Sequence, residues 1–195
     1  MIAITLVIIF MICSALAEDE INSLKASPEG NLNDISLLKL SKSETYMIVT
    51  ADKRASIAAK NILDKGGSAI DAVIAAQMVL NVVEPQSSGI GGGGFLIYFD
   101  ANKKESLAFD GRERAPIKYH SKVFLRKDGN KKGFIEAISG GLAVGAPSLL
   151  SMLEVSHKKY GLLDWKNLFN EAINYAGNGF IVGERLSKLS KKAPH

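Results

Sequence analysis

The stretch from Val83 to Pro116 constrains this chain most, because it ends a helix, turns on glycine and then continues as strands. Pro85 has no backbone N–H and cannot continue a helix, so the apolar run 69–83 is predicted to be a helix that ends near Glu84. Five of the six residues 89–94 are glycine. Glycine permits positive φ and close backbone contact but loses the most conformational entropy on ordering, so this run needs a packing or ligand reason.

Two β-type segments follow the glycines, Phe95–Asp100 and Glu105–Asp110, and the polar turn Ala101–Lys104 joins them. Short apolar runs separated by a few polar residues are typical of a β-hairpin. Arg112 follows at the end of the second segment. A guanidinium presents a planar fork of donors that can hold a carboxylate through two parallel hydrogen bonds. Arg112 is therefore a candidate binding residue.

Two helices are predicted ahead of this stretch. The segment Arg54–Lys65 carries small and apolar residues on one face, and the Gly66–Gly67 pair ends it. Ser68, with Asp71 three residues later, is a capping-box pattern that predicts the start of the second, alanine-rich helix. A short strand is predicted over Met47–Thr50, before the first helix.

Two further helices are predicted after the hairpin. Pro147 suits the first turn of a helix that runs to about Tyr160, where Gly161 caps it. Asp164 can cap the next helix. The apolar residues of that helix have the spacing of one buried face and are predicted to be core: Trp165, Leu168, Phe169, Ala172, Ile173 and Ala176.

Several strings in this chain resemble strings of the γ-glutamyltransferases, which are glutathione hydrolases of the N-terminal nucleophile class. They are KGGSAIDAVIAAQMVLNVVEPQSSG at 65–89, SSGIGGGGF at 87–95, DGRERAP at 110–116 and SGGLAVGAP at 139–147. The resemblance implies an α/β (α+β) fold, the N-terminal portion of a four-layer αββα sandwich. It further implies that residues 46–195 are the first part of the family's large subunit.

The resemblance gives Arg112 a specific role. In the family, the arginine of the D-x-R-E string binds the α-carboxylate of the γ-glutamyl group, and Arg112 stands at the matching position. Glutathione or another γ-glutamyl compound is therefore the implied ligand. From the residues alone, the alternative is an ion pair of Arg112 with Asp110 or Glu113. Arg114 stands where the family pattern varies and is interpreted as a surface or pairing residue.

The resemblance also implies a nucleophile. Family members cleave their precursor ahead of a threonine, whose hydroxyl attacks the γ-glutamyl amide while its α-amine acts as base. Threonine occurs in this sequence only at positions 5, 45 and 50, and none stands in the T-T-H string of the family. We therefore assign no catalytic residue within the chain and expect hydrolysis to need a small-subunit chain that carries the threonine. The alternatives are an inactive exported protein that keeps the carboxylate site, and a relative acting on another amide.

Glu84, Ser87 and Ser88 lie in the loop ahead of the glycines. Serines in such loops most often satisfy backbone groups, and Glu84 stands where a helix-end carboxylate would. We therefore interpret all three residues as structural rather than catalytic.

The first 17 residues carry no charge, are nearly all apolar, and end in the A-x-A pattern Ala15–Ala17 that signal peptidase recognises. They predict export to the periplasm or out of the cell, with an uncleaved membrane anchor as the alternative. Cys13 lies within this segment, so the cleaved product would contain no cysteine and could form no disulfide. Residues 18–45 are polar and are predicted to be a loosely ordered lead to the domain.

Other functions find little support in the sequence. The run Gly89–Gly94 spells G-x-G-x-x-G, but a dinucleotide site needs a strand before the glycines and a helix after them, the reverse of the order here. His120, His157 and His195 lack metal-ligand spacing. The net charge of +4 is scattered and is not interleaved with aromatic residues as in nucleic-acid-binding proteins. We expect no cofactor, metal or nucleic acid.

Overall fold

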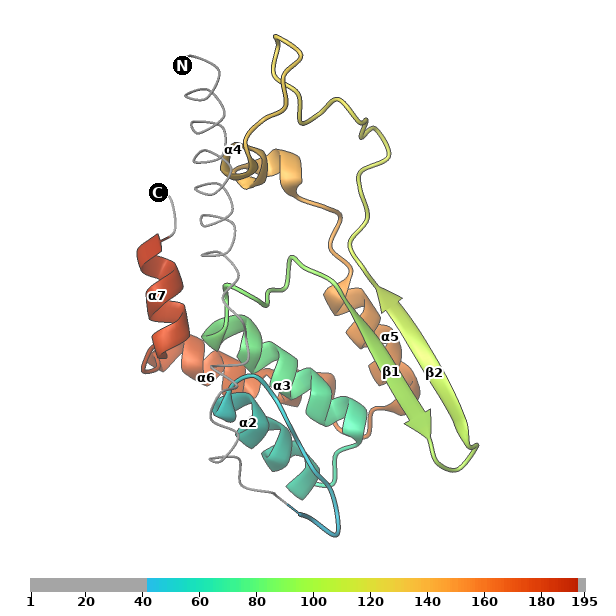
Figure 1. The fold of residues 1–195 in the computed structure, drawn as a ribbon. Coiled ribbons are helices and arrows are strands. Elements are labelled where there is room, and N and C mark those ends of the chain that lie inside the picture. Colours follow the sequence, from blue (N-terminus) through green and yellow to red (C-terminus); the bar gives the residue numbers. More distant parts are fainter. Residues whose placement is uncertain (1–41, 193–195) are drawn as a thin grey trace, which may run out of the picture. The chain divides into compact units, whose positions relative to one another are not determined.

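The computed structural model describes residues 42–192, so the predicted signal segment 1–17 and residues 18–41 lie outside the described residues. Residues up to Met47 and residues from Ile48 onward form separate units, and the described part of the first contains neither helix nor strand. The second unit contains α2 Lys53–Asp64, α3 Ala69–Val83, β1 Gly94–Asp100, β2 Glu105–Gly111, α4 Phe134–Ile138, η2 Gly141–Ala143, α5 Leu149–Tyr160, η3 Trp165–Phe169, α6 Asn170–Asn178 and α7 Glu184–Lys192 (Figure 1). Within the described residues, no helix has the length and apolar character needed to cross a membrane.

A helix–glycine–helix corner opens the second unit. α2 begins after Asp52, whose carboxylate accepts a hydrogen bond from the Arg54 amide (2.8 Å). Gly66 has a φ of +82°, the left-handed conformation that favours glycine after a helix. Ser68 and Asp71 form the predicted capping box at the start of α3. Both helices and their corner are therefore confirmed.

α3 is the central helix of the core. Ile74, Val79 and Val83 of α3 are fully buried. The small side chains on one face of α2 let it pack closely on α3, and α5, η3 and α6 pack against other parts of α3. The residues contributed by these neighbours are Ala55, Ala58, Ala59 and Ile62 of α2, with Leu149, Met152, Leu153, Leu168 and Ala172 of the later helices.

The Asp71 carboxylate connects α3 to the loop that follows α5. Asp71 is fully buried, and its Oδ2 accepts hydrogen bonds from the N–H groups of Ser68 (2.8 Å), Leu162 (2.9 Å) and Leu163 (3.2 Å). Its Oδ1 lies 3.4 Å from Nε2 of His157 on α5. A buried carboxylate stabilises a fold only when hydrogen bonds replace its lost hydration; three donors do so for Oδ2, whereas Oδ1 has no hydrogen-bond partner among the described residues.

β1 and β2 form the predicted antiparallel hairpin, in which Gly94 pairs with Gly111. One face of the hairpin packs on α5, where the Tyr98 and Tyr160 ring centroids are 4.5 Å apart (Figure 1). The opposite face exposes three large apolar side chains of β1, which are Phe95, Ile97 and Phe99. The hairpin therefore has one apolar face that the described residues do not cover.

The glycine run between α3 and β1 contacts both the hairpin and the start of α5. The Gly92 carbonyl accepts hydrogen bonds from the N–H groups of Ser148 and Leu149, both at 3.2 Å. A Cβ on Gly93 would lie 2.3 Å from the Gly111 carbonyl oxygen, closer than side chains approach backbone. No glycine of this run has a positive φ. Close backbone contact, rather than left-handed conformation, therefore explains Gly92 and Gly93, whereas a Cβ on Gly89 or Gly91 would meet no atom within 4 Å.

Two predictions about local structure are wrong. Met47–Thr50 is not a strand, because a strand needs a ladder partner and the sheet formed by the described residues has two strands, β1 and β2. Pro147 lies before the N-cap residue Ser148 instead of in the first turn of α5. The Gly92 carbonyl accepts hydrogen bonds from the N–H groups of Ser148 and Leu149. The first residue of α5 therefore has no unpaired N–H that a proline would remove.

The predicted core face after Asp164 is only partly buried. Leu168 and Ala172 are buried as predicted, whereas Ile173 and Ala176 are exposed. The segment begins as the 3-10 helix η3 and continues as α6. A 3-10 helix has 3.0 residues per turn instead of 3.6, so an α-helical spacing does not keep these residues on one face.

The close approach at Gly93 is testable. We expect Gly93→Ala to lower the free energy of unfolding by about 1–3 kcal/mol, because the new methyl group would overlap the Gly111 carbonyl oxygen. Gly91→Ala is the matched control, since a Cβ there would meet no atom within 4 Å. Urea denaturation followed by circular dichroism measures both variants. Equal stabilities would contradict the packing reason for the glycine run.

The Asp71 junction gives a second stability prediction. We expect Asp71→Ala to lower the free energy of unfolding by about 2 kcal/mol or more, because the N–H groups of Leu162 and Leu163 lose their acceptor. Glu154→Ala removes the same charge from an exposed ion pair on α5 and is expected to cost less than about 1 kcal/mol. Urea denaturation measures the free energy of unfolding of both variants. Similar decreases for the two would show that Asp71 does not stabilise the contact between α3 and the loop after α5.

Candidate functional site

Arg112 directly follows β2 and lies at the protein surface. Gly111, the last residue of β2, is buried so closely against α5 that a Cβ on it would lie 2.6 Å from the Met152 Cβ. The Arg112 amide donates a hydrogen bond to Oδ1 of Asp110 (2.9 Å). The backbone at the strand end is therefore fixed, while the Arg112 side chain is 66% exposed.

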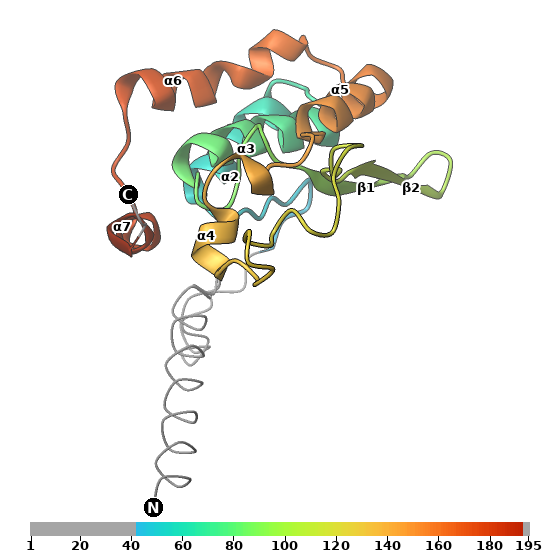
Figure 2. The same ribbon diagram turned by 90° about the horizontal axis from the view of Figure 1, so that it is seen from above.

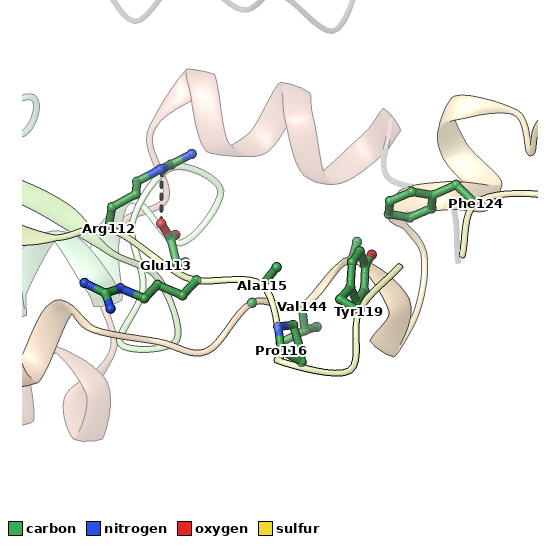
Figure 3. Close-up of a pocket in the computed structure, with 10 residues that line it drawn as sticks. Arg112, Glu113, Ala115, Pro116, Tyr119, Phe124 and Val144 are labelled. Atoms are coloured by element: carbon green, nitrogen blue, oxygen red, sulfur yellow. Dashed lines mark ion pairs between the residues drawn. The ribbon is translucent and has the colours of Figure 1, made fainter. Parts of the chain in front are cut away.

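Glu113 forms an ion pair with the Arg112 guanidinium, with Nη1 of Arg112 3.0 Å from Oε2 of Glu113, although the two groups are not aligned for a hydrogen bond (Figure 3). The Glu113 side chain is 28% exposed and its Oε2 is buried. Two glycines make the space for it, because a Cβ on Gly93 would lie 2.7 Å from Oε2 and one on Gly145 3.0 Å from the Glu113 Cβ, while Gly92 lies next to Oε1 at ordinary contact distance. The enclosed carboxylate therefore limits where the exposed guanidinium can go.

An open pocket of about 350 Å³ lies beside this ion pair. A backbone bridge between Arg114 and Ala146 (N···O 3.3 and 2.7 Å) joins the two segments that form its walls. Figure 3 shows the ion pair toward one end and the Tyr119 and Phe124 rings, whose centroids are 6.0 Å apart, toward the other. The lining residues are Arg112, Glu113, Arg114, Ala115, Pro116, Tyr119, Phe124, Ala143, Val144 and Gly145. One end of the pocket is thus charged and the other is aromatic.

Of the two ion pairs predicted as an alternative role for Arg112, one is present. Its guanidinium pairs with Glu113, whereas Asp110 contacts only the Arg112 backbone amide. Arg114 is exposed and lines the pocket, as a surface residue would, and in the described part of the chain its guanidinium forms no ion pair. The ion pair with Glu113 and a binding role for Arg112 are compatible, because a guanidinium has five N–H donors.

The loop ahead of the glycines differs from expectation. The hydroxyls of Ser87 and Ser88 contact side chains rather than backbone: Arg185 donates to Ser87 Oγ (3.0 Å), and Ser88 Oγ donates to Asn81 Oδ1 (2.7 Å). Arg185 of α7 also donates to Oε2 of Glu84 (2.8 Å). The contact of Arg185 with this loop was not predicted from the sequence, because Arg185 lies 101 residues from Glu84 and no spacing rule connects the two.

No metal site is visible between residues 42 and 192, where no group of three or more His, Cys, Asp and Glu side chains could hold an ion. His157 packs on the Trp165 ring, with centroids 5.2 Å apart, and faces Asp71. His120 is exposed, and His195 lies outside the described residues. At the glycine run the helix α3 precedes and the strand β1 follows, the order that argues against a dinucleotide site.

Comparisons with known proteins agree with the quoted strings. A family model described as gamma-glutamyltranspeptidase matches residues 55–195. The chain is 40% identical over 150 residues to the glutathione hydrolase proenzyme of Bacillus subtilis (strain 168), covering 75% of this chain and 26% of that protein. It is 36% identical over 180 residues to glutathione hydrolase 3 of Arabidopsis thaliana, covering 92% of this chain and 26% of that protein.

A solved structure gives the same result for the fold. The gamma-glutamyltranspeptidase of Helicobacter pylori aligns with a TM-score of 0.74 and 35% identity, covering 80% of this chain and 44% of that chain. The predicted α+β, N-terminal nucleophile hydrolase class is therefore confirmed. The chain spans about a quarter of the length of the two curated relatives named above. With a family model matched over most of its residues, the chain belongs to the gamma-glutamyltranspeptidase family.

Proposed function

We propose that this chain is the part of a γ-glutamyltransferase that binds the α-carboxylate of a γ-glutamyl compound such as glutathione, and that Arg112 is the binding residue. The observation that carries the proposal is the place of Arg112, which follows β2 in the D-x-R-E string and lines an open pocket. Its guanidinium is two-thirds exposed, so donors beyond the one facing Glu113 are accessible to a ligand.

The ion pair supports binding by reducing its entropic cost. A free arginine side chain loses considerable rotamer freedom when it holds a ligand. Here Glu113 is enclosed by glycines and already restricts the Arg112 guanidinium before a ligand arrives. A planar fork held in place can then accept a carboxylate in one orientation, which directs the γ-amide of the substrate away from the arginine.

The chemical step is assigned to a residue outside this sequence. In the proposed reaction, a threonine hydroxyl attacks the γ-carbonyl carbon, the C–N bond breaks, and the amine leaves with a proton; water or an acceptor amine then releases the glutamyl group. Since threonine occurs here only at positions 5, 45 and 50, a small-subunit segment supplies the nucleophile. The role of this chain is to bind and orient the substrate.

The protein is further proposed to be exported and to form part of a large subunit. The uncharged apolar residues 1–17 support export, either after cleavage at Ala17 or with the segment kept as an anchor. Residues 46–195 then form the large-subunit part of the enzyme. Detection of a mature chain that begins at Glu18, by N-terminal sequencing of the exported protein, would support cleavage over anchoring.

Titration of the 195-residue chain with glutathione, followed by NMR, tests the role of Arg112. We expect Arg112→Ala to weaken binding about tenfold, because a two-pronged, charge-assisted contact is lost. Arg112→Lys keeps the charge but not the fork, so its affinity is expected to fall about threefold. The readout is the dissociation constant of each variant.

Arg126→Ala is the matched control. Arg126 forms an exposed ion pair with Glu136, as Arg112 does with Glu113, but it does not line the pocket. Its hydrogen bonds hold the pKa of the Glu136 carboxyl below its usual range, and replacing Arg126 removes the same charge as replacing Arg112. Glutathione binding that is unchanged in Arg112→Ala, or weakened equally by both variants, would contradict the proposed function.

A further inference from the structure

Arg114 is a second cation on the wall of the same pocket. Its backbone is fixed, because its N–H donates to the Ala146 carbonyl (3.3 Å) and its carbonyl accepts from the Ala146 N–H (2.7 Å). Arg114 therefore extends from an anchored position, although its side chain is exposed.

The positive charge of Arg114 is not offset by a neighbouring carboxylate of the described residues. Glu113 faces and offsets the charge of Arg112, at 3.0 Å. In the described part of the chain, the Arg114 guanidinium has no carboxylate within ion-pair distance, whereas Arg126 nearby in the sequence is paired with Glu136. Two arginines and one glutamate among the ten lining residues leave the pocket with a net charge of +1. A pocket of this charge favours a ligand with more anionic than cationic groups.

The spacing of the two arginines suits a ligand with two carboxylates. Residues two apart on an extended backbone are roughly 6.6 Å apart, and the long arginine side chains can widen or narrow that separation. A γ-glutamyl peptide carries one carboxylate on its glutamyl end and, when its leaving group ends in a free acid, a second at the other end. Val144 and the Tyr119 ring also border the pocket and offer apolar surface to the uncharged part of such a ligand.

We propose that Arg114 is a specificity residue that binds the second carboxylate, so that the site prefers γ-glutamyl compounds with an acidic leaving group over those with a neutral one. This inference rests on the proposed function, in which Arg112 binds the first carboxylate. It names a ligand preference that a lone carboxylate-binding arginine would not produce.

The test compares two ligands on the same chain. Glutathione and glutathione ethyl ester differ in the C-terminal carboxylate, which the ester neutralises. We expect the wild-type chain to bind glutathione about 2- to 5-fold more tightly than the ester, the range for an exposed ion pair. Arg114→Ala is expected to reduce this ratio to about one, and Arg114→Lys to keep part of it, because the second site recognises charge.

Two further variants distinguish failure of this inference from failure of the proposed function. Arg112→Ala is expected to weaken both ligands and keep their ratio. Lys118→Ala removes a charge from the same exposed segment but does not line the pocket, and should leave the ratio unchanged. A ratio of one in the wild type, or a ratio unaffected by Arg114→Ala, would overturn the role of Arg114 alone. If neither ligand binds, or Arg112→Ala weakens neither, both proposals fail.

Discussion

The buried Asp71 carboxylate joins the central helix α3 to the loop after α5, and the position of the hairpin follows from this junction. It caps α3 and also accepts hydrogen bonds from the N–H groups of Leu162 and Leu163, so it fixes the end of α5 relative to the central helix. α5 in turn supports the hairpin, because Met152 packs directly on Gly111 at the end of β2. The position of the next residue, Arg112, therefore follows from a chain of contacts that begins more than forty residues earlier. Figure 2 shows α5 and the hairpin as neighbours on the same side of α3.

Glycines from two distant parts of the chain position the Glu113 carboxylate beside Arg112. Gly92, Gly93 and Gly145 come from two strings about fifty residues apart, yet all three face Glu113. A side chain at Gly93 would displace both the carboxylate and the strand end, and one at Gly145 would crowd the Glu113 Cβ. Ordering a glycine-rich loop costs conformational entropy. Here the ordered loop encloses the Glu113 carboxylate, which in turn pairs with Arg112.

Local chemistry predicted much of this fold. The capping box at Ser68 and the proline at position 85 defined α3, and the polar turn at 101–104 defined the hairpin, because each rule concerns neighbours in sequence. Contacts between distant residues could not be predicted in the same way. No local pattern connects Arg185 to Glu84, and none showed that Met47–Thr50 lacks a strand partner. For the site, the family strings indicated Arg112, whereas the aromatic wall of the pocket came from the structure.

The most direct test of the central claim is hydrolysis of γ-glutamyl-p-nitroanilide. The 195-residue chain would be assayed alone and mixed with a separately produced partner that supplies the rest of the large subunit and the small subunit with the nucleophilic threonine. We expect no hydrolysis by the chain alone, hydrolysis by the mixture, and loss of that activity when the chain carries Arg112→Ala. Activity of the chain alone, or a mixture unaffected by Arg112→Ala, would show that the threonine or the arginine has been assigned wrongly.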